Sequence, residues 1–153
     1  MVQKEAVLTD KAPLPLPIFS QAIKCGPMVY CSGSVGMNPT ANTLIEGEVG
    51  ARAEQCLKNL SVILEEAGSS LDKVVKVNIF LTNMESFAPV NMVYEKYFNK
   101  EPKPCRTCVA VFQLPLSTDV EIECVAHLYF IVWHPITEST HMDFDYKARG
   151  HTR

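Results

Sequence analysis

Residues 51–81, ARAEQCLKNLSVILEEAGSSLDKVVKVNIFL, contain the change of hydrophobic period that decides the fold. The first half of the stretch repeats apolar residues at i, i+3, i+4 and i+7, which is the pattern of an amphipathic helix. Gly68 then stands where a helix C-terminus favours a left-handed residue. We therefore expect a helix over 53–67, and its buried face is predicted to comprise Ala53, Cys56, Leu57, Leu60, Ile63, Leu64 and Ala67.

The second half of the stretch, residues 73–81, is rich in Val and Ile and alternates with period two, as a half-buried strand does. Lys76 and Asn78 fall on one face of this strand. Because successive side chains of a strand point to opposite faces, the opposite face is predicted to carry Val75, Val77, Ile79 and Leu81.

Four further strands are predicted outside this stretch. Apolar runs at 18–24 and 28–32 flank the turn signal Gly26-Pro27, and strands are also predicted at 106–112 and 120–132. A second helix is predicted between the strands at 73–81 and 106–112. It is predicted to start at a Thr82/Glu85 capping box, and its apolar stripe comprises Phe87, Val90, Asn91, Tyr94, Tyr97 and Phe98.

The resulting order, β-β-α-β-α-β-β, predicts an α+β sandwich in which two helices pack on one face of a mixed sheet. A chain of 153 residues corresponds to one domain, which we place at 1–132. Residues 133–153 are predicted to be a polar, disordered C-terminal tail. Because no further helix covers the second face of the sheet, we expect the protein to self-associate through it.

Composition excludes several classes of protein. The chain has 14 Lys+Arg against 17 Asp+Glu, a formal net charge of −3, so it lacks the basic footprint of a nucleic-acid-binding protein. No apolar run reaches the ~20 residues that span a bilayer. The N-terminus, with Lys4, Glu5, Asp10 and Lys11, resembles neither a secretory signal nor a transit peptide. We expect a soluble, cytoplasmic protein.

The six cysteines are interpreted as reduced, small hydrophobic residues, since nothing in the chain indicates secretion. Cys105 and Cys108 form a C-x-x-C pair, which can indicate redox or zinc chemistry. Here the pair opens a predicted strand and has no second C-x-x-C or His pair nearby. We therefore expect no metal site and no redox function.

Three polar positions stand out within the apolar patterns. Arg106 opens a strand with apolar residues on both faces, so its guanidinium either meets an anion, pairs internally with a Glu, or extends to solvent. Glu121 and Glu123 share one face of the last strand, where they can perform acid/base chemistry, form a solvated edge or pair with an Arg. Asn91 lies on a helical apolar stripe, where a structural hydrogen bond to backbone is the ordinary explanation.

Five collinear segments together resemble the RidA/YjgF family of reactive-intermediate deaminases, from about residue 3 to residue 130. The most specific of them are PCRTCVAV and VEIECVA. The five segments are PIFSQAIK (17–24), SGSVGMNP (32–39), FAPVNMVYEKYF (87–98), PCRTCVAV (104–111) and VEIECVA (120–126).

The resemblance implies a chorismate-mutase-like fold assembled as a homotrimer with active sites between subunits. It also implies an imine deaminase, a hydrolase acting on C=N bonds. The substrates would be 2-aminoacrylate, 2-iminopropanoate and 2-iminobutanoate, and the products 2-oxo acids and ammonia. No cofactor or metal is implied.

The resemblance also assigns roles by position. Arg106 matches the arginine that clamps the substrate carboxylate, and Glu121 matches the glutamate that positions or activates the attacking water. Cys108 matches the cysteine whose backbone carbonyl faces the substrate amine. Ser32 and Gly33 match residues that line the cleft.

Two further positions follow from the same match. Asn91 matches a helix asparagine near the pocket. Phe19 stands where many active members have Tyr, which predicts weakened turnover or altered substrate choice. Two alternatives stay open: a trimer that binds small carboxylates or proteins without catalysis, and an endoribonuclease or translation inhibitor. The mitochondrion is the alternative compartment, because relatives occupy both.

Overall fold

The computed structural model describes residues 3–129 as one six-stranded sheet with two helices packed on it. The predicted polar tail at 133–153 therefore lies outside the described residues, and the domain division stays a prediction. Short 3-10 turns occupy Leu71–Lys73, Met84–Ser86 and Pro115–Ser117. The main elements are β1 (Lys4–Val7), β2 (Ala22–Cys25), β3 (Met28–Cys31), α1 (Val49–Glu66), β4 (Val74–Leu81), α2 (Phe87–Tyr97), β5 (Cys105–Ala110) and β6 (Val120–His127).

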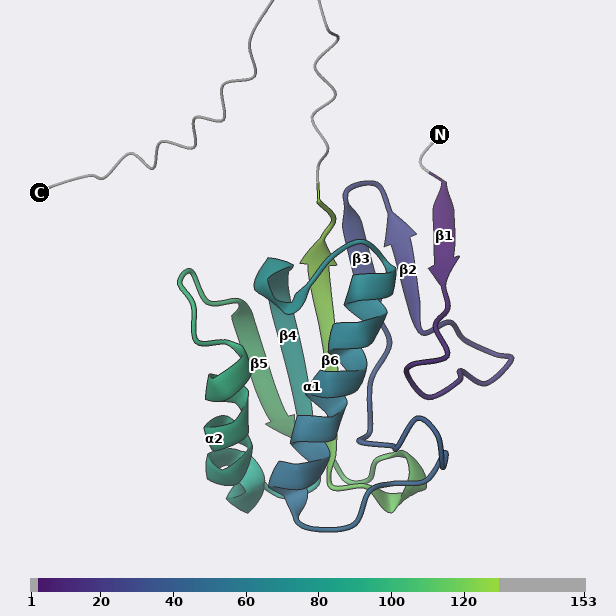
Figure 1. Ribbon diagram of the computed structural model, residues 1–153. Coiled ribbons are helices and arrows are strands. Elements are labelled where there is room, and N and C mark those ends of the chain that lie inside the picture. The colour runs from purple at the N-terminus through teal and green to yellow at the C-terminus, as the bar shows by residue number, and fades with distance from the viewer. Residues whose placement is uncertain (1–2, 130–153) are drawn as a thin grey trace, which may run out of the picture.

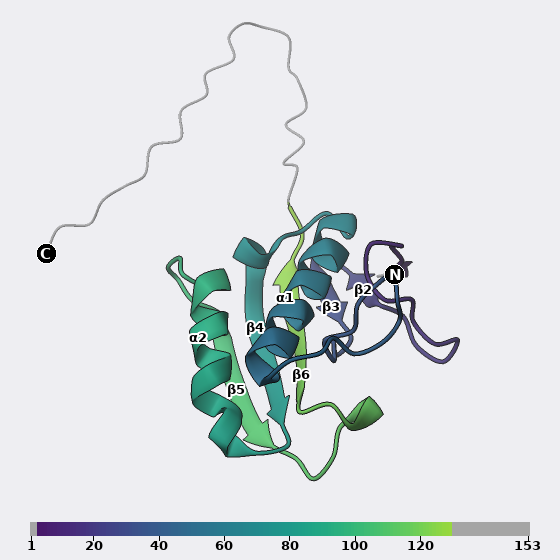
Figure 2. The ribbon, with the colours of Figure 1, turned by 60° about the horizontal axis from the view of Figure 1, so that its bottom comes forward.

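The strands run in the order β1-β2-β3-β6-β4-β5, so the last strand inserts into the middle of the sheet. Only β4 and β5 are parallel, and α2 connects them; the other neighbours are antiparallel. Figures 1 and 2 show α1 and α2 side by side on the same face of the sheet. This arrangement confirms the predicted α+β sandwich with both helices on one face of a mixed sheet.

The core lies between α1 and the central strands. Leu57, Leu60 and Leu64 of α1 are almost completely buried, and they belong to the same apolar cluster as Ile79 and Ile122 of the sheet. Full burial of each such side chain stabilises the fold by roughly 1.5–3 kcal/mol. The helical stripe predicted from the sequence is therefore the stripe that packs on the sheet.

The opposite face of the sheet carries a mixture of polar and apolar side chains. Lys76 donates a hydrogen bond to Thr107 across β4 and β5, with 2.6 Å between the nitrogen and the oxygen. Tyr30, Val75 and Val109 on this face are each more than 40% exposed, which is unusual for large apolar residues in strands. We call this surface the open face.

Several predicted boundaries were wrong. β1 was not predicted and extends the sheet beyond β2, because Lys4–Val7 pairs in register with Ala22–Cys25. The predicted strand at 18–24 forms only from Ala22, so Phe19 lies in the preceding loop. β6 ends at His127, not at 132: its last pair joins His127 to Met28, and Leu128 and Tyr129 lie outside the strand.

Two local predictions also failed. A register shift between Val74 and Lys76 moves Val75 off the buried face, so Val74 is buried and Val75 is exposed. The Thr82/Glu85 capping box is absent: Asn83 accepts the hydrogen bond from the amide of Glu85, and it caps the 3-10 turn that precedes α2. No helix within residues 3–129 is long and apolar enough to cross a membrane.

Candidate functional site

Arg106 lies on β5, at the edge of the sheet, and its side chain points toward α2. Its Nη1 donates a hydrogen bond to Oδ1 of Asn91 at 2.8 Å. The guanidinium carbon lies 5.4 Å from the ring centroid of Phe87 and 4.9 Å from that of Tyr94. Within residues 3–129, no carboxylate forms an ion pair with Arg106. Of the three alternatives for Arg106, internal pairing with a Glu is therefore absent within these residues, and Asn91 bonds to Arg106 instead of to backbone.

Tyr94 is the most buried of the side chains around Arg106. Burial raises the pKa of its phenol to about 12, although the nearby positive charge of Arg106 acts in the opposite direction. Its hydroxyl is buried and makes no hydrogen bond to any group of the described residues. The ring of Tyr94 is thus the part of this side chain that contacts the cluster. We call Arg106, Asn91, Phe87, Tyr94 and Cys108 the arginine half-site.

The two cysteines of the C-x-x-C pair point to opposite faces of β5. Cys108 is opposite the buried Ile79, whereas Cys105 is opposite Lys76 of the open face. Burial raises the pKa of the Cys108 thiol, which keeps it protonated at neutral pH. All six cysteines are free thiols. The pair therefore lacks the side-by-side geometry of a redox-active dithiol.

Glu121 lies on β6 and packs directly over Gly33. A Cβ atom added to Gly33 would lie 1.8 Å from Oε1 of Glu121, so a side chain at this position would displace the carboxylate. Burial raises the pKa of Glu121, and the negative charge of Glu123 raises it further. Within residues 3–129, no group donates a hydrogen bond to the Glu121 carboxylate, so its oxygens are available to a water or a ligand.

Glu123 differs from Glu121 although both lie on the open face, as predicted. Nδ2 of Asn78 donates a hydrogen bond to Oε1 of Glu123 at 2.7 Å. The two carboxylates are therefore not equivalent: one is held by an amide from the neighbouring strand, and the other is unpartnered. Glu121 is the better candidate for acid/base chemistry.

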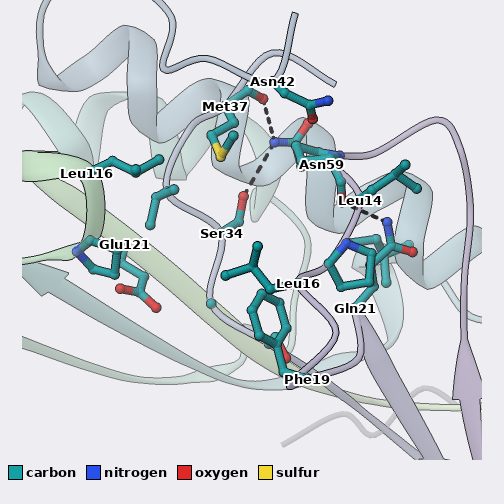
Figure 3. Close-up of a pocket in the computed structure, with 17 residues that line it drawn as sticks. Leu14, Leu16, Phe19, Gln21, Ser34, Met37, Asn42, Asn59, Leu116 and Glu121 are labelled. Atoms are coloured by element: carbon teal, nitrogen blue, oxygen red, sulfur yellow. Dashed lines mark hydrogen bonds between the residues drawn. The ribbon is translucent and has the colours of Figure 1, made fainter. Parts of the chain in front are cut away.

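A cavity of about 570 Å³ lies beside Glu121 and falls within the size range of small-molecule sites. Four of the residues predicted for the site line it: Phe19, Ser32, Gly33 and Glu121. Figure 3 shows Ser34 between Glu121 on one side and Asn59 on the other. We call these four predicted residues the glutamate half-site.

The remaining cavity walls were not predicted, and they are mainly apolar. They come from the loop at 13–16, from Met37, from Ile63 of α1, and from Pro115 and Leu116. Asn59, which also lines the cavity, is almost completely buried and donates from Nδ2 to the carbonyl of Met37 at 2.9 Å. The loops that form this wall are far apart in sequence, so no local pattern identifies it.

Arg52 and Asp119 form a bidentate ion pair behind the glutamate half-site. Nε of Arg52 donates to Oδ1 of Asp119 at 2.6 Å, and Nη2 donates to Oδ2 at 2.5 Å. The guanidinium also bonds to the carbonyl of Gly47. The hydrogen bonds from Arg52 lower the pKa of Asp119. Asp119 immediately precedes β6, so this pair fixes the start of the strand that carries Glu121.

The two half-sites point to opposite faces of the sheet. Arg106 is opposite Val77, and Val77 is opposite Cys124, so Arg106 points to the helix-covered face. Glu121 is three residues before Cys124 on β6, and three residues along a strand reverse the face. Arg106, Cys108 and Asn91 do not line the cavity beside Glu121. One chain therefore carries both half-sites but does not bring them together.

No group of three or more His, Cys, Asp or Glu side chains suited to a metal ion occurs within the part of the chain that the structure describes.

Comparison with known proteins gives a consistent result. The sequence profile of the family described as Endoribonuclease L-PSP matches residues 9–128. The chain is 54% identical over 112 residues to "Protein mmf1, mitochondrial" of Schizosaccharomyces pombe, which covers 71% of this chain and 67% of that protein. It is 42% identical over 127 residues to "Reactive Intermediate Deaminase A, chloroplastic" of Arabidopsis thaliana, covering 83% of this chain and 67% of the relative.

A solved structure, the crystal structure of yeast Mmf1, superimposes with a TM-score of 0.80. It is 42% identical in sequence, and the match covers 83% of this chain and all of that one. Residues 9–128, which the family profile matches, include both half-sites. The chain therefore belongs to the Endoribonuclease L-PSP family, the RidA/YjgF family that its motifs resemble.

Proposed function

We propose that this protein hydrolyses reactive enamine and imine acids to 2-oxo acids and ammonia, in clefts between the subunits of a homotrimer. The observation that carries the proposal is the pair of half-sites: within residues 3–129, Arg106 has no carboxylate partner and Glu121 has neither an ion pair nor a hydrogen-bond donor. A second copy of the chain can place one half-site against the other. The relative named Reactive Intermediate Deaminase A supports the same chemistry.

Arg106 would bind the substrate carboxylate. One N–H of its guanidinium bonds to Asn91, so the remaining donors are available for a bidentate contact with a carboxylate. The proposed substrates, 2-aminoacrylate, 2-iminopropanoate and 2-iminobutanoate, all carry this group. Phe19, Ser32 and Gly33 would line the other side of the cleft, and the backbone carbonyl of Cys108 would accept a hydrogen bond from the substrate amine.

Glu121 would activate the attacking water. The protonated imine is already electrophilic, so the site need only hold it beside one oriented water. Glu121 accepts a proton as the water oxygen bonds to the imine carbon, and a carbinolamine forms. Glu121 then passes this proton to the amine and takes the hydroxyl proton as the C=O bond forms. The C–N bond breaks with its electrons on nitrogen, and ammonia and the 2-oxo acid leave. No cofactor enters this scheme.

The homotrimer is part of the proposal. Tyr30, Val75 and Val109 on the open face are large apolar residues exposed to solvent in one chain. Burial of such a surface between copies would stabilise the assembly and would cover the face that the helices leave uncovered. Activity would then depend on assembly, because each chain supplies only part of a cleft.

A coupled assay tests the proposal. A serine/threonine dehydratase generates the imine in the presence of semicarbazide, and the protein is expected to suppress formation of the semicarbazone. Arg106→Ala should abolish the effect, and Arg106→Lys should restore it only weakly because lysine lacks the planar fork. Unchanged semicarbazone yield from a verified trimer would contradict the proposal.

One observation favours a second candidate, a trimer that binds small carboxylates without catalysis. Phe19 lines the cavity without the hydroxyl that many active relatives carry there. Binding of a 2-oxo acid without suppression of the semicarbazone would support this alternative. The endoribonuclease alternative fits less well, because the net charge of −3 disfavours RNA. A cytoplasmic location, with the mitochondrion as the alternative, stays a prediction.

A further inference from the structure

We infer that Phe87 and Tyr94 are positioning residues for Arg106: their rings fix the plane of its guanidinium, so that it meets a substrate carboxylate with its fork already oriented. This inference rests on the proposed function, since it concerns how that site binds its substrate. It adds two aromatic residues whose role is to hold the arginine and not to contact the substrate.

The setting of Arg106 is unusual for a half-buried arginine. Long charged side chains on a sheet edge ordinarily extend to solvent or pair with a carboxylate. Arg106 forms no ion pair within the described residues, and its side-chain hydrogen bond and both of its cation–π contacts come from α2. Phe87, Asn91 and Tyr94 are spaced at i, i+4 and i+7, so α2 presents all three on one stripe toward β5.

Asn91 and the two aromatic rings act on the guanidinium in different ways. The Asn91 amide oxygen accepts one N–H and so fixes the in-plane orientation of the guanidinium. The rings lie 5.4 Å and 4.9 Å from its central carbon, within the range of a cation–π contact. Such contacts stabilise the cation without using any N–H donor. The remaining donors therefore stay free for an anion, which a carboxylate partner within the chain would have prevented.

The Tyr94 hydroxyl shows which part of this side chain can position Arg106. It is buried and has no hydrogen-bond partner among the described residues, so it does not hold Arg106 through a polar contact. The aromatic ring of Tyr94, and not its hydroxyl, therefore contacts the guanidinium. Tyr94→Phe keeps the ring and removes an unsatisfied polar group, whereas Tyr94→Leu removes the ring.

The chain also offers a matched control. Phe98 stacks on Tyr94 with 4.5 Å between ring centroids and is as buried as Tyr94, but it is not among the rings that contact Arg106. Phe98→Leu therefore removes a neighbouring aromatic ring from the same core without removing the ring beside the guanidinium. A purely structural role for Tyr94 predicts that the two leucine variants behave alike.

The experiment compares wild type, Tyr94→Phe, Tyr94→Leu and Phe98→Leu as verified oligomers below their melting temperatures. Steady-state parameters for imine hydrolysis and the Kd of 2-oxobutanoate, the 2-oxo acid formed from 2-iminobutanoate, are both measured. For Tyr94→Leu we expect KM and Kd to rise about 2- to 30-fold, the range of a cation–π contact, with a smaller change in kcat. Tyr94→Phe should stay within about twofold of wild type, as should Phe98→Leu.

Each other outcome is informative. Equal changes in Tyr94→Leu and Phe98→Leu, or an unchanged Tyr94→Leu, would overturn the positioning role and leave the proposed hydrolysis intact. If wild type binds 2-oxobutanoate but does not hydrolyse imines, the catalytic proposal fails, and the Kd series still decides the role of the rings. If wild type neither hydrolyses imines nor binds the oxo acid, both proposals fail.

Discussion

Arg106 and Glu121 belong to the same sheet, yet their side chains point to opposite faces of it. The register places Arg106 beside Val77 on the helix-covered side and Glu121 beside Phe80 on the open face. One strand, β4, therefore lies between the strand of Arg106 and the strand of Glu121, and neither side chain forms an ion pair within residues 3–129. This separation makes assembly the condition for bringing the two groups together.

Subunit mixing tests that condition. Arg106→Ala and Glu121→Ala are each expected to be inactive alone. If each cleft takes Arg106 from one chain and Glu121 from the next, random mixing of the two variants in a cyclic trimer leaves about one quarter of the clefts intact. Imine hydrolysis by the refolded mixture should recover to about that fraction of wild type. No recovery in confirmed mixed trimers would show that the two residues act within one chain or not together.

A side chain at Gly33 is expected to displace the Glu121 carboxylate and reduce activity. Gly33→Ala places a methyl group 1.8 Å from Oε1 of Glu121, so the carboxylate must move and activity should fall by at least tenfold. Gly50→Ala is the control, because its Cβ would meet Val93 at an ordinary 3.7 Å within a helix. The control should be fully active and about 0.5–1 kcal/mol more stable. A fully active Gly33→Ala would show that the position of Glu121 is not critical.

The pH profile of imine hydrolysis should reflect the raised pKa of Glu121. Glu121 acts as a base only when ionised, so imine hydrolysis should fall as pH decreases through a pKa above the ordinary Glu value. Glu123→Gln removes a nearby negative charge and should shift this acidic limb to lower pH. An unchanged limb in Glu123→Gln would mean that another group sets the profile.

The same raised pKa has a consequence for stability. The folded state holds the Glu121 proton more tightly than the unfolded state, so ionised Glu121 destabilises the fold above its folded pKa. Glu121→Gln should therefore be more stable than wild type at neutral pH and inactive. The gain should vanish as pH falls below the unfolded pKa. Thermal unfolding at two pH values measures it, and a Glu121→Gln variant that is less stable at neutral pH would contradict the burial effect.

The contribution of Asp119 to stability should depend on pH in the opposite sense to that of Glu121. Arg52 lowers its pKa, so the stabilisation is present above the unfolded pKa and is lost as pH falls through the folded pKa. Asp119→Asn should cost about 1.5–3 kcal/mol at neutral pH, a decrease in Tm of about 2–4 °C per kcal/mol, and less in acid. Glu101→Gln, in an exposed pair with Lys103, should leave Tm unchanged. Equal losses at neutral and acid pH would exclude the ion pair as the cause.

Phe19→Tyr tests the departure from many active relatives. Phe19 lines the cavity beside Glu121, so a tyrosine hydroxyl would add a polar group at that wall. One hydrogen bond of about 1 kcal/mol corresponds to a roughly fivefold change in kcat/KM. We expect Phe19→Tyr to raise turnover of small imines by about that factor. A decrease would indicate that the apolar wall is itself required.

The amino-acid sequence was enough to predict the two main helices, most of the strands and the residue types of the candidate site. The stripe from Ala53 to Ala67 and the alternation in 73–81 identified α1 and β4, because each element buries the face that its own period defines. Arg106, Asn91 and Glu121 were likewise recognisable as polar groups in apolar patterns, and the motifs around them indicated the family. These features depend on residues that are neighbours along the chain.

Tertiary structure alone decided how those groups are placed relative to one another. The insertion of β6 between β3 and β4 sets the faces of Arg106 and Glu121. The bidentate pair of Arg52 with Asp119 and the close approach of Gly33 to Glu121 join segments far apart in sequence. Because a shift of register by one residue reverses the face of every side chain in a strand, such placements follow from the pairing of the strands and not from the pattern within any one of them.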